Sequence, residues 1–563
     1  MKDLSRRLVV MMSLAAAACA ADPSMMTGDD AGGDDAADPR CEAARGELHA
    51  QVLADGDGVD DRVYWLYVPA SYACAQPAPV LVDFHGTAGD VPEEAYQTPA
   101  LIAFAEANGV IVARPRARPR TWNGYDLYQW DGNAGDIPRN REFAKRLVAD
   151  LEARYAIDPA RVYASGFSSG ANMAAQFLFD AQSPFAGLAP IAGGNWTTQG
   201  PSPSLAGGPR LYLATGYRDY LWGYAASTDT AARAAGLEAD RIWLRRTGGG
   251  HDLYAWHFDE LWRFLDGGER PSPGSIAAPW TEATLPQPAD VLAFARDGGD
   301  LVAAGGKGRM WRRGAGESAW TLELDRGAPD FTALCFGADT AVVGGQYRVA
   351  YRGQSGWTAN SAFPDYGQIG GGWVNGAACR DDGSIVLGGY WSAAVTGDAG
   401  ATYASYAIPV SGGAYQAQVA GLASAGATTI AVGYYDYVAT GGATGTTYVD
   451  HGATTEWWNA VTIASGSAWA VGDAGAILRS SDGGATWTPQ ASGTSENLYA
   501  VHFADAQRGA AVGRRGTVVV TTNGGATWTP RPLGREVFLG AVAVDAGAVT
   551  VAGEDGVVAS SPL

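Results

Sequence analysis

The chain has 563 residues, of which 47% are hydrophobic, 10% aromatic and 17% charged, and its formal net charge at pH 7 is −20. This length suggests roughly three to four domains, or fewer if barrels or propellers are present. The acidic balance argues against nucleic acid and anionic lipid surfaces as partners. A low charged content with abundant Gly, Thr and Trp is typical of a β-rich, extracytoplasmic protein.

The N-terminus has the pattern of a secretion signal, predicted at residues 1–20. Basic residues precede an apolar run over residues 8–18, which is too short to span a bilayer. Residues 16–19 (AAAC) resemble a bacterial lipobox, which predicts lipidation of Cys19. The alternative is an A-x-A cut at residues 18–20 and plain secretion. We therefore expect a cell-envelope lipoprotein or a secreted bacterial protein that meets the membrane only through a lipid anchor.

Residues 21–40 are acidic and rich in Gly and Ala, which predicts a disordered linker. Residues 41–270 then alternate strand-like and helix-like segments. Residues 80–84 (VLVDF) and 110–113 (VIVA) are typical strands, whereas residues 139–155 place Phe143, Leu147 and Leu151 on one helical face. Alternating units of this kind predict a mostly parallel sheet with helices on both faces.

Residues 166–170 (GFSSG) form a G-x-S-x-G motif between a predicted strand and a predicted helix. A nucleophile elbow needs this context, because small residues allow the tight turn that presents the serine. Ser168 is the candidate nucleophile, and an ordinary turn serine is the alternative. Asp219 and His251 follow later predicted strands in the order Ser, Asp, His, which makes them the candidate acid and base. The alternatives left open are Asp229 or Asp240 as the acid and His257 as the base.

These segments resemble the polyhydroxybutyrate depolymerase and feruloyl esterase group of α/β-hydrolases. The similarity lies in residues 82–86 (VDFHG), 122–123 (WN), 156–163 (AIDPARVY), the serine motif and 248–251 (GGGH). Thr215 stands where the family usually has His, and the loop over residues 217–224 lacks the usual Pro.

The resemblance implies an α/β-hydrolase fold and a cofactor-independent serine esterase. Ser168, Asp219 and His251 would be its triad, and the backbone N–H groups of Thr87 and Ser169 its oxyanion hole. Polyesters such as polyhydroxybutyrate and feruloyl or acetyl esters of polysaccharide are the expected substrates. Peptide hydrolysis and a catalytically inactive binding lipoprotein are the alternatives.

Several aromatic residues near these motifs are candidates for a substrate groove that takes an aryl ester, a sugar or a polymer chain. An equally good interpretation is that they pin loops to the fold. The predicted substrate-binding residues are Trp122, Tyr125, Trp196 and Trp222.

After a linker at residues 271–278, the pattern changes to repeats. Residues 480–490 (SSDGGATWTPQ) and 521–531 (TTNGGATWTPR) nearly match, and residues 396–403 (TGDAGATY) are a degenerate copy. All three resemble the Asp-box, and internal repeats of this length predict a propeller or a solenoid. The region also resembles the Asp-box propellers similar to photosystem II assembly factors, which implies a propeller that acts by binding. A polymer, a glycan or a protein is the expected ligand of this part of the chain.

Aromatic residues recur in this region at spacings of 37 to 46 residues, about the length of a four-stranded blade. We expect seven blades over residues 279–563, the last closed by the segment around Trp280 and by the C-terminal strand, because an open blade would expose an unpaired edge. The recurring residues are Trp320, Trp357, Tyr403, Tyr448, Trp487 and Trp528.

The cysteines divide between the two halves. A disulfide between Cys41 and Cys74 is expected in an oxidising compartment, with two separate thiols as the alternative. Cys335 and Cys379 fall at equivalent inner-strand positions of adjacent blades, where buried free thiols are expected. No His/Cys cluster has the spacing of metal ligands, so no metal site is predicted.

Overall fold

In the computed structural model the chain divides into two compact units. The first comprises residues up to 214, 223–245 and 253–270, and the second comprises residues 215–222, 246–252 and 271–563. The predicted signal peptide, the acidic linker, Cys19 and Cys41 lie outside the residues that the structure describes. Those residues are 45–54, 61–87, 98–122, 125–130, 136–195, 204–268, 270, 274–327, 330–337, 341–345, 348–353, 356–359, 373–389, 393–408, 418–434, 436–451, 457–545 and 547–563.

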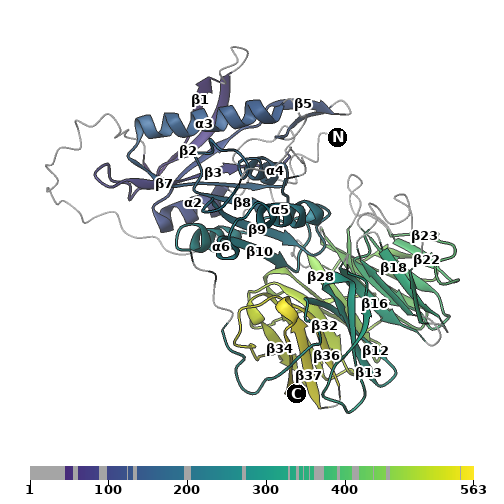
Figure 1. The fold of residues 1–563 in the computed structure, drawn as a ribbon. Helices are drawn as coiled ribbons and strands as arrows, with labels where there is room; N and C mark the ends of the chain where they lie inside the picture. Colours follow the sequence, from purple (N-terminus) through teal and green to yellow (C-terminus); the bar gives the residue numbers. More distant parts are fainter. Residues whose placement is uncertain are drawn as a thin grey trace, which may run out of the picture. The chain divides into compact units, whose positions relative to one another are not determined.

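A mixed eight-stranded sheet organises the first unit, with the strand order β1-β2-β4-β3-β7-β8-β9-β10 (Figure 1). Its inner strands β4, β3, β7, β8 and β9 pair in parallel, whereas β1 and β2 add antiparallel at one edge. The strands are β1 (Leu48–Ala54), β2 (Asp61–Tyr67), β3 (Ala78–Phe84), β4 (Ile111–Pro115), β7 (Ile157–Phe167), β8 (Gly187–Ile191), β9 (Arg210–Gly216) and β10 (Ile242–Thr247).

Helices cover both faces of this sheet, because side chains of a strand alternate between its faces. Val80 and Val82 of β3 join the core beneath α3, α4 and α5, whereas Leu81 joins the core beneath α2 and α6. The remaining elements of this part of the chain are α2 (Thr98–Asn108), β5 (Pro119–Trp122), β6 (Tyr125–Tyr128), α3 (Asp136–Arg154), α4 (Ser169–Ala175), α5 (Trp222–Ala234), η3 (Ala239–Arg241) and α6 (Trp256–Leu265).

Seven four-stranded antiparallel sheets form the propeller of the second unit, as the repeats predict. The first six are β12 (Val291–Asp297), β13 (Asp300–Gly305), β14 (Arg309–Arg313), β15 (Thr321–Asp325); β16 (Phe331–Phe336), β17 (Ala341–Gly345), β18 (Arg348–Gly353), β19 (Gly356–Ala359); β20 (Gly376–Cys379), β21 (Ile385–Gly388), β22 (Ala393–Thr396), β23 (Ala404–Tyr406); β24 (Val419–Ala425), β25 (Thr428–Gly433), β26 (Tyr437–Gly442), β27 (Gly445–Tyr448); β28 (Trp458–Ala464), β29 (Ser467–Gly472), β30 (Ile477–Ser480), β31 (Thr488–Gln490); and β32 (Leu498–Phe503), β33 (Gly509–Gly513), β34 (Val518–Thr521), β35 (Thr529–Pro530). Short 3-10 turns join the second and third strands of several blades: η4 (Gly306–Gly308), η5 (Asp473–Gly475), η6 (Arg514–Gly516) and η7 (Glu554–Gly556).

The seventh blade takes strands from both ends of the propeller sequence, which confirms the predicted closure. β11 (Thr281–Ala283) pairs antiparallel with β38 (Val558–Pro562), which continues through β37 (Ala548–Gly553) to β36 (Leu539–Val544). Trp280 is buried in the core of this blade, and its indole N–H donates to the Arg531 carbonyl at 3.2 Å. The shared sheet leaves no open blade edge where the two ends meet.

The three nearly identical repeat segments fold into the same hydrogen-bonded turn. In the turn after β30, the Gly484 N–H donates to Ser480 Oγ at 2.8 Å, and Asp482 accepts from the Thr486 N–H at 2.9 Å and its hydroxyl at 2.6 Å. The turn after β22 repeats these bonds with Asp398 and Thr402. In the turn after β34, Asn523 Oδ1 accepts the Thr527 N–H at 2.9 Å, but its Nδ2 donates to the Thr527 hydroxyl at 2.9 Å. The repeated letters therefore encode a repeated turn geometry.

The structure corrects the expected state of two cysteines. Cys335 on β16 and Cys379 on β20 form a disulfide, although free thiols were predicted. Their inner-strand positions in adjacent blades were predicted correctly, and the Cα atoms there are 5.7 Å apart, which is bonding range. Cys74 is also disulfide-bonded, but its expected partner Cys41 lies outside the described residues.

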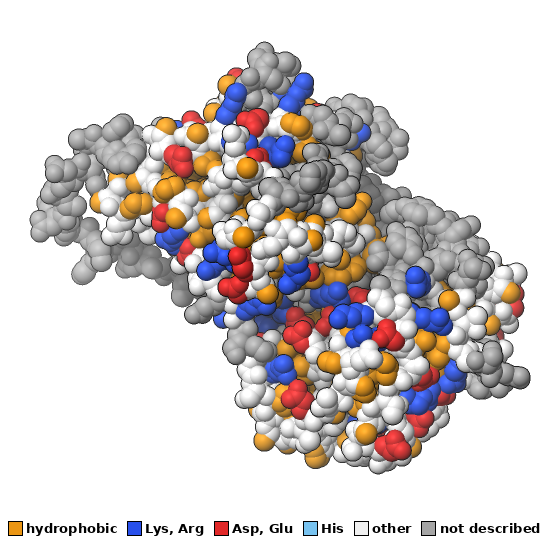
Figure 2. All heavy atoms as spheres, in the orientation of Figure 1, with side chains coloured by type: hydrophobic (Ala, Val, Ile, Leu, Met, Phe, Trp, Pro, Cys, Tyr) orange, Lys and Arg blue, Asp and Glu red, His pale blue; other side chains and the backbone are white. Residues whose placement is uncertain are grey.

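Figure 2 shows acidic and basic side chains interspersed on the face drawn, with no broad field of one sign. Within the ranges given above, no helix is long and apolar enough to cross a membrane. No group of three or more His, Cys, Asp or Glu side chains in those ranges is arranged to hold a metal ion.

Candidate functional site

The turn between β7 and α4 holds Ser168 in an unusual backbone conformation. Its φ is 56° and its ψ is −117°, a region that residues with a side chain rarely adopt. Such a conformation costs on the order of 1–3 kcal/mol and persists only where the surroundings enforce it. A nucleophile elbow, in which a sharp turn presents the serine, needs a strained turn of this kind.

Two glycines make this turn possible. A Cβ on Gly166 would lie 2.2 Å from the Gly170 carbonyl oxygen, and one on Gly170 would lie 1.9 Å from the Phe84 carbonyl oxygen. The Ser168 N–H donates to the Ile191 carbonyl at 3.0 Å, and the Ser168 carbonyl accepts from the Asn172 N–H at 3.1 Å. The glycines of the motif thus allow close backbone packing, and hydrogen bonds to β8 and to the first turn of α4 hold the serine.

The residues expected to provide the oxyanion hole lie at two chain positions beside this turn. Ser169 is buried at the first position of α4, where a helical N–H has no acceptor within its own helix. Thr87 is exposed and follows Gly86 after β3. The roles of both N–H groups stay predictions.

His85 has a structural arrangement next to Gly86. Its Nε2 accepts the Ala117 N–H at 2.9 Å, so its Nδ1 carries the proton and donates to the Gly86 carbonyl at 2.5 Å. Burial lowers the pKa of His85 to about 4, which keeps the ring neutral. The ring therefore fixes the chain just before Thr87.

Asp219 and His251 lie together in the second unit. His251 Nδ1 is 3.0 Å from Asp219 Oδ1, and the Asp219 side chain is fully buried. Asp219 also accepts from the Leu221 N–H at 2.7 Å and from the Thr215 hydroxyl at 3.2 Å. Thr215, which departs from the family pattern, thus helps to hold the carboxylate.

Tyr220 was not among the predicted site residues. Its ring centroid is 4.6 Å from that of His251, and 40% of its surface is exposed. An aromatic ring in this position restricts the orientation of the imidazole. Its only signal in the sequence is its position next to Asp219.

The alternative acids and base have other environments. Asp229 pairs with Arg233 one turn along α5, and Asp240 is exposed in η3. His257 is buried in α6, accepts the Tyr254 N–H at 2.9 Å and packs against Trp256. The contacts of Asp229 and His257 are those of residues that stabilise a helix, and they give no sign of a catalytic role.

The predicted substrate-binding aromatics are described only in part. Trp122 and Tyr125 are register partners on the hairpin of β5 and β6, but their side chains and Trp196 lie outside the described residues. The Trp222 ring lies 3.9 Å from the guanidinium carbon of Arg246. Trp222 therefore has a cation–π partner within the second unit.

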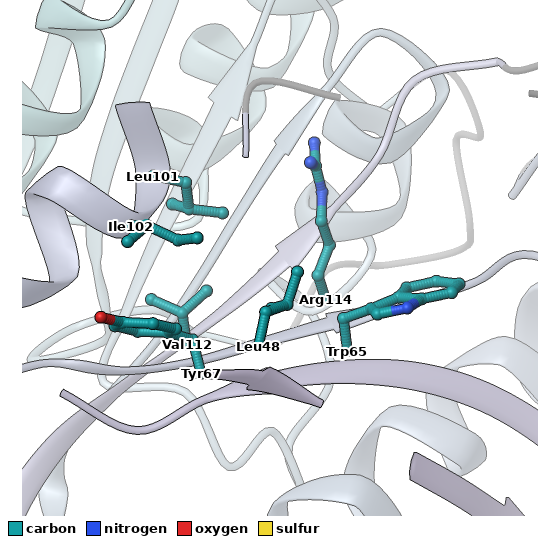
Figure 3. A pocket seen from close by; sticks show the side chains of 7 residues that line it. All are labelled: Leu48, Trp65, Tyr67, Leu101, Ile102, Val112 and Arg114. Carbon is teal, nitrogen blue, oxygen red and sulfur yellow. The ribbon is translucent and has the colours of Figure 1, made fainter. Parts of the chain in front are cut away.

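A small hollow in the first unit lies between the sheet edge and α2 (Figure 3). Its volume is about 20 Å³, room for roughly one water molecule. Its lining is apolar apart from Tyr67 and Arg114, and it contains no nucleophile. We therefore do not regard it as a candidate active site. The residues around it are Leu48, Trp65, Tyr67, Leu101, Ile102, Val112 and Arg114.

Comparisons with known proteins find relatives of two kinds. The family described as photosynthesis system II assembly factor YCF48 matches residues 443–520. A poly(3-hydroxyalkanoate) depolymerase C from Paucimonas lemoignei is 33% identical over 120 residues, which are 21% of this chain and 28% of that protein. A putative esterase, NocK, from Nocardia uniformis subsp. tsuyamanensis is 32% identical over 147 residues, 25% of this chain and 39% of that protein.

Among solved structures, YCF48 from Cyanidioschyzon merolae is similar to 50% of this chain and 98% of its own, with 16% identity and a TM-score of 0.42. The chain spans less than half the length of either curated relative. The predicted resemblances to a depolymerase and esterase group and to a propeller of the assembly-factor kind are confirmed by these matches.

Proposed function

We propose that the protein is a serine hydrolase of carboxylic esters with an α/β-hydrolase domain. The observation that carries this proposal is the strained backbone of Ser168 in a G-x-S-x-G turn between a parallel strand and a helix. The hydrogen bond between Asp219 and His251 supplies the matching acid and base. Similarity to a depolymerase and an esterase supports the same class of reaction.

The mechanism proposed is acyl transfer in two steps. His251 takes the proton of the Ser168 hydroxyl through Nε2, and the serine oxygen attacks the ester carbonyl. Asp219 holds Nδ1–H and stabilises the imidazolium that forms. The alcohol leaves with a proton from His251, and water then hydrolyses the acyl-enzyme by the same route. The N–H groups of Thr87 and Ser169 would stabilise the oxyanion, at roughly 3 kcal/mol each.

The preferred substrate is a polymeric ester, either a polyester or an acylated polysaccharide. The first curated relative is named for poly(3-hydroxyalkanoate), which favours the polyester. The interblade disulfide supports an oxidising, extracytoplasmic location, in keeping with the lipobox-like Cys19. The expected ligand of the propeller is a polymer, a glycan or a protein. An inactive binding lipoprotein is the rival, and the retained Asp219–His251 bond argues against it.

The test is hydrolysis of short p-nitrophenyl esters, followed by polyhydroxybutyrate films and feruloylated xylan. The wild-type chain should cleave short esters and one of the two polymers. Ser168→Ala should reduce turnover by at least about 10⁴-fold and leave the melting temperature of the first unit unchanged, because alanine keeps the Cβ and therefore the same backbone strain. Equal turnover by the two proteins would exclude Ser168 as the nucleophile.

A further inference from the structure

The two segments that carry Asp219 and His251 belong to the second unit, together with the propeller. They are residues 215–222 and 246–252, named here the acid–base segments. They hydrogen-bond to each other, since the Tyr217 N–H donates to the Thr247 carbonyl at 2.9 Å and the Arg218 N–H to the Gly249 carbonyl at 3.2 Å. A displacement of either segment therefore acts on both catalytic candidates.

Arg246 joins these segments to two propeller carboxylates. Its Nη1 lies 2.8 Å from Asp330 Oδ2 and 3.2 Å from Asp290 Oδ2, and its guanidinium lies over the ring of Trp222. Burial alone would lower the pKa of Arg246, but the carboxylates of Asp330 and Asp290 outweigh it and raise the pKa. The ion pair is half-buried, with 21% of the arginine side chain exposed, so solvent screens it less than a surface pair.

Each of these two carboxylates also accepts a hydrogen bond from a backbone N–H group inside the propeller. Asp290 Oδ1 accepts the Asp555 N–H at 2.7 Å, and Asp330 Oδ1 accepts the Lys307 N–H at 2.8 Å. Asn497 does the same for the Ala474 N–H at 3.0 Å in another blade. An amide is therefore sufficient to hold this turn. The negative charges at positions 290 and 330 face Arg246 and are not needed for the turns.

Aromatic rings of the propeller support the same segments. The Tyr217 ring packs with Tyr499 and Phe538 in one buried cluster. A Cβ on Gly248 would lie 2.3 Å from ring atoms of both Tyr499 and Phe538, so only glycine fits there. A Cβ on Gly250, next to His251, would lie 2.4 Å from the Tyr434 hydroxyl.

We propose that the propeller positions the Asp219–His251 pair, with Arg246, Asp290 and Asp330 as positioning residues for catalysis. This inference rests on the proposed esterase function and extends it, because it gives the propeller a part in the reaction with small esters. A misplacement of about 1 Å can reduce catalysis by about 100-fold. The ion pairs of Arg246 and the ring contacts at Gly248 and Gly250 act directly on the segment that carries His251.

The experiment uses the full-length protein and the double variant Asp290→Asn/Asp330→Asn. The variant keeps both oxygen acceptors for the turns and removes both charges that face Arg246. We expect kcat for p-nitrophenyl butyrate to fall about 10- to 100-fold, with KM within about twofold of wild type. Arg246→Lys, which keeps one charge, should recover part of the loss seen in Arg246→Gln.

The matched control is Asp325→Asn, which breaks the Arg309–Asp325 pair at 3.1 Å in the first blade without touching the acid–base segments. Its kcat should equal that of wild type. Hydrogen exchange of peptides covering residues 215–222 and 246–252 provides a readout independent of activity. Exchange there should rise in the double variant and stay at the wild-type rate in the control.

These readouts separate the two proposals. Unchanged exchange and unchanged kcat in a folded double variant would overturn the positioning role while leaving the esterase proposal intact. Raised exchange in a protein that cleaves no ester, even as wild type, would support the anchoring and reject the proposed function. If the double variant fails to fold, the comparison of Arg246→Lys with Arg246→Gln decides the same question.

Discussion

The serine turn of the first unit and the acid–base segments of the second unit are positioned by different means. The turn at Ser168 depends on Gly166 and Gly170, each two chain positions away, and has a strained φ of 56°. Ile191 and Phe84 also contact this turn. Asp219 and His251 are carried by segments whose contacts come from residues far along the chain, such as Asp290, Asp330 and Phe538. Local geometry makes a motif recognisable, whereas support from distant residues leaves no local pattern.

The largest effect is expected for the acid–base pair itself. His251→Ala should lower turnover of short esters by about 10⁴-fold or more, and Asp219→Asn by a comparable factor, because the imidazole loses its proton-accepting role or its orientation. His257→Ala and Asp229→Asn are the matched controls and should lose less than about tenfold. Steady-state kinetics checks the ranking, and the reverse ranking would move the base to His257.

Next in size is the interblade disulfide. The bond between Cys335 and Cys379 closes a loop of 44 residues, for which chain entropy predicts about 4 kcal/mol of stabilisation. Cys335→Ser/Cys379→Ser should therefore lower the melting temperature of the second unit. The first unit should melt as before, as seen by calorimetry. An unchanged second transition would mean that the bond contributes nothing to the native propeller.

Acid should destabilise both units through one histidine each. Burial lowers the pKa of His85 and of His502 to about 4, against about 6.5 in the unfolded chain. Each neutral ring therefore contributes stability in full above pH 6.5, and this contribution is lost as pH falls from 6.5 towards 4, at most about 3 kcal/mol per histidine.

Two variants separate these contributions. His502 Nδ1 accepts the Val544 N–H at 3.0 Å, and His502→Asn keeps an acceptor near that place. In this variant the melting temperature of the second unit should fall less between pH 7 and pH 5 than in wild type. The melting temperature of the first unit should show the wild-type pH dependence. His85→Gln offers an acceptor in place of Nε2. This variant should reduce the pH dependence of the first unit's melting temperature and leave that of the second unit unchanged. Equal slopes in all three proteins would assign the loss to other groups.

The smallest effect is expected in a repeat turn. Hydrogen bonds with Thr486 lower the pKa of Asp482 to about 2, yet in the next blade Asn523 accepts the Thr527 N–H and donates through Nδ2 to the Thr527 hydroxyl, so an amide also bridges the turn. Asp482→Asn should therefore change the melting temperature by less than about 1 °C, whereas Asp482→Ala should cost about 1 kcal/mol because the Thr486 N–H loses its acceptor. Thermal melting of the two variants side by side makes the comparison.

The sequence by itself determined the features that repeat or that depend on neighbouring residues. The alternating segments predicted the central parallel strands, and the spacing of Trp487 and Trp528 predicted the blades and their closure through Trp280. The glycines around Ser168 predicted the strained turn. These predictions are correct because backbone sterics and side-chain periodicity act over a few residues and therefore produce a pattern in the local sequence.

Only the tertiary structure decided the rest. The approach of Cys335 to Cys379, the Thr215 hydrogen bond to Asp219, the ring of Tyr220 beside His251 and the ion pair of Arg246 all join residues by position in space. In the sequence, nothing distinguishes Arg246 from the other charged residues in predicted strands. Its partners lie 44 and 84 positions away, and no local periodicity relates residues at such separations, because the folded backbone alone brings them within hydrogen-bonding distance.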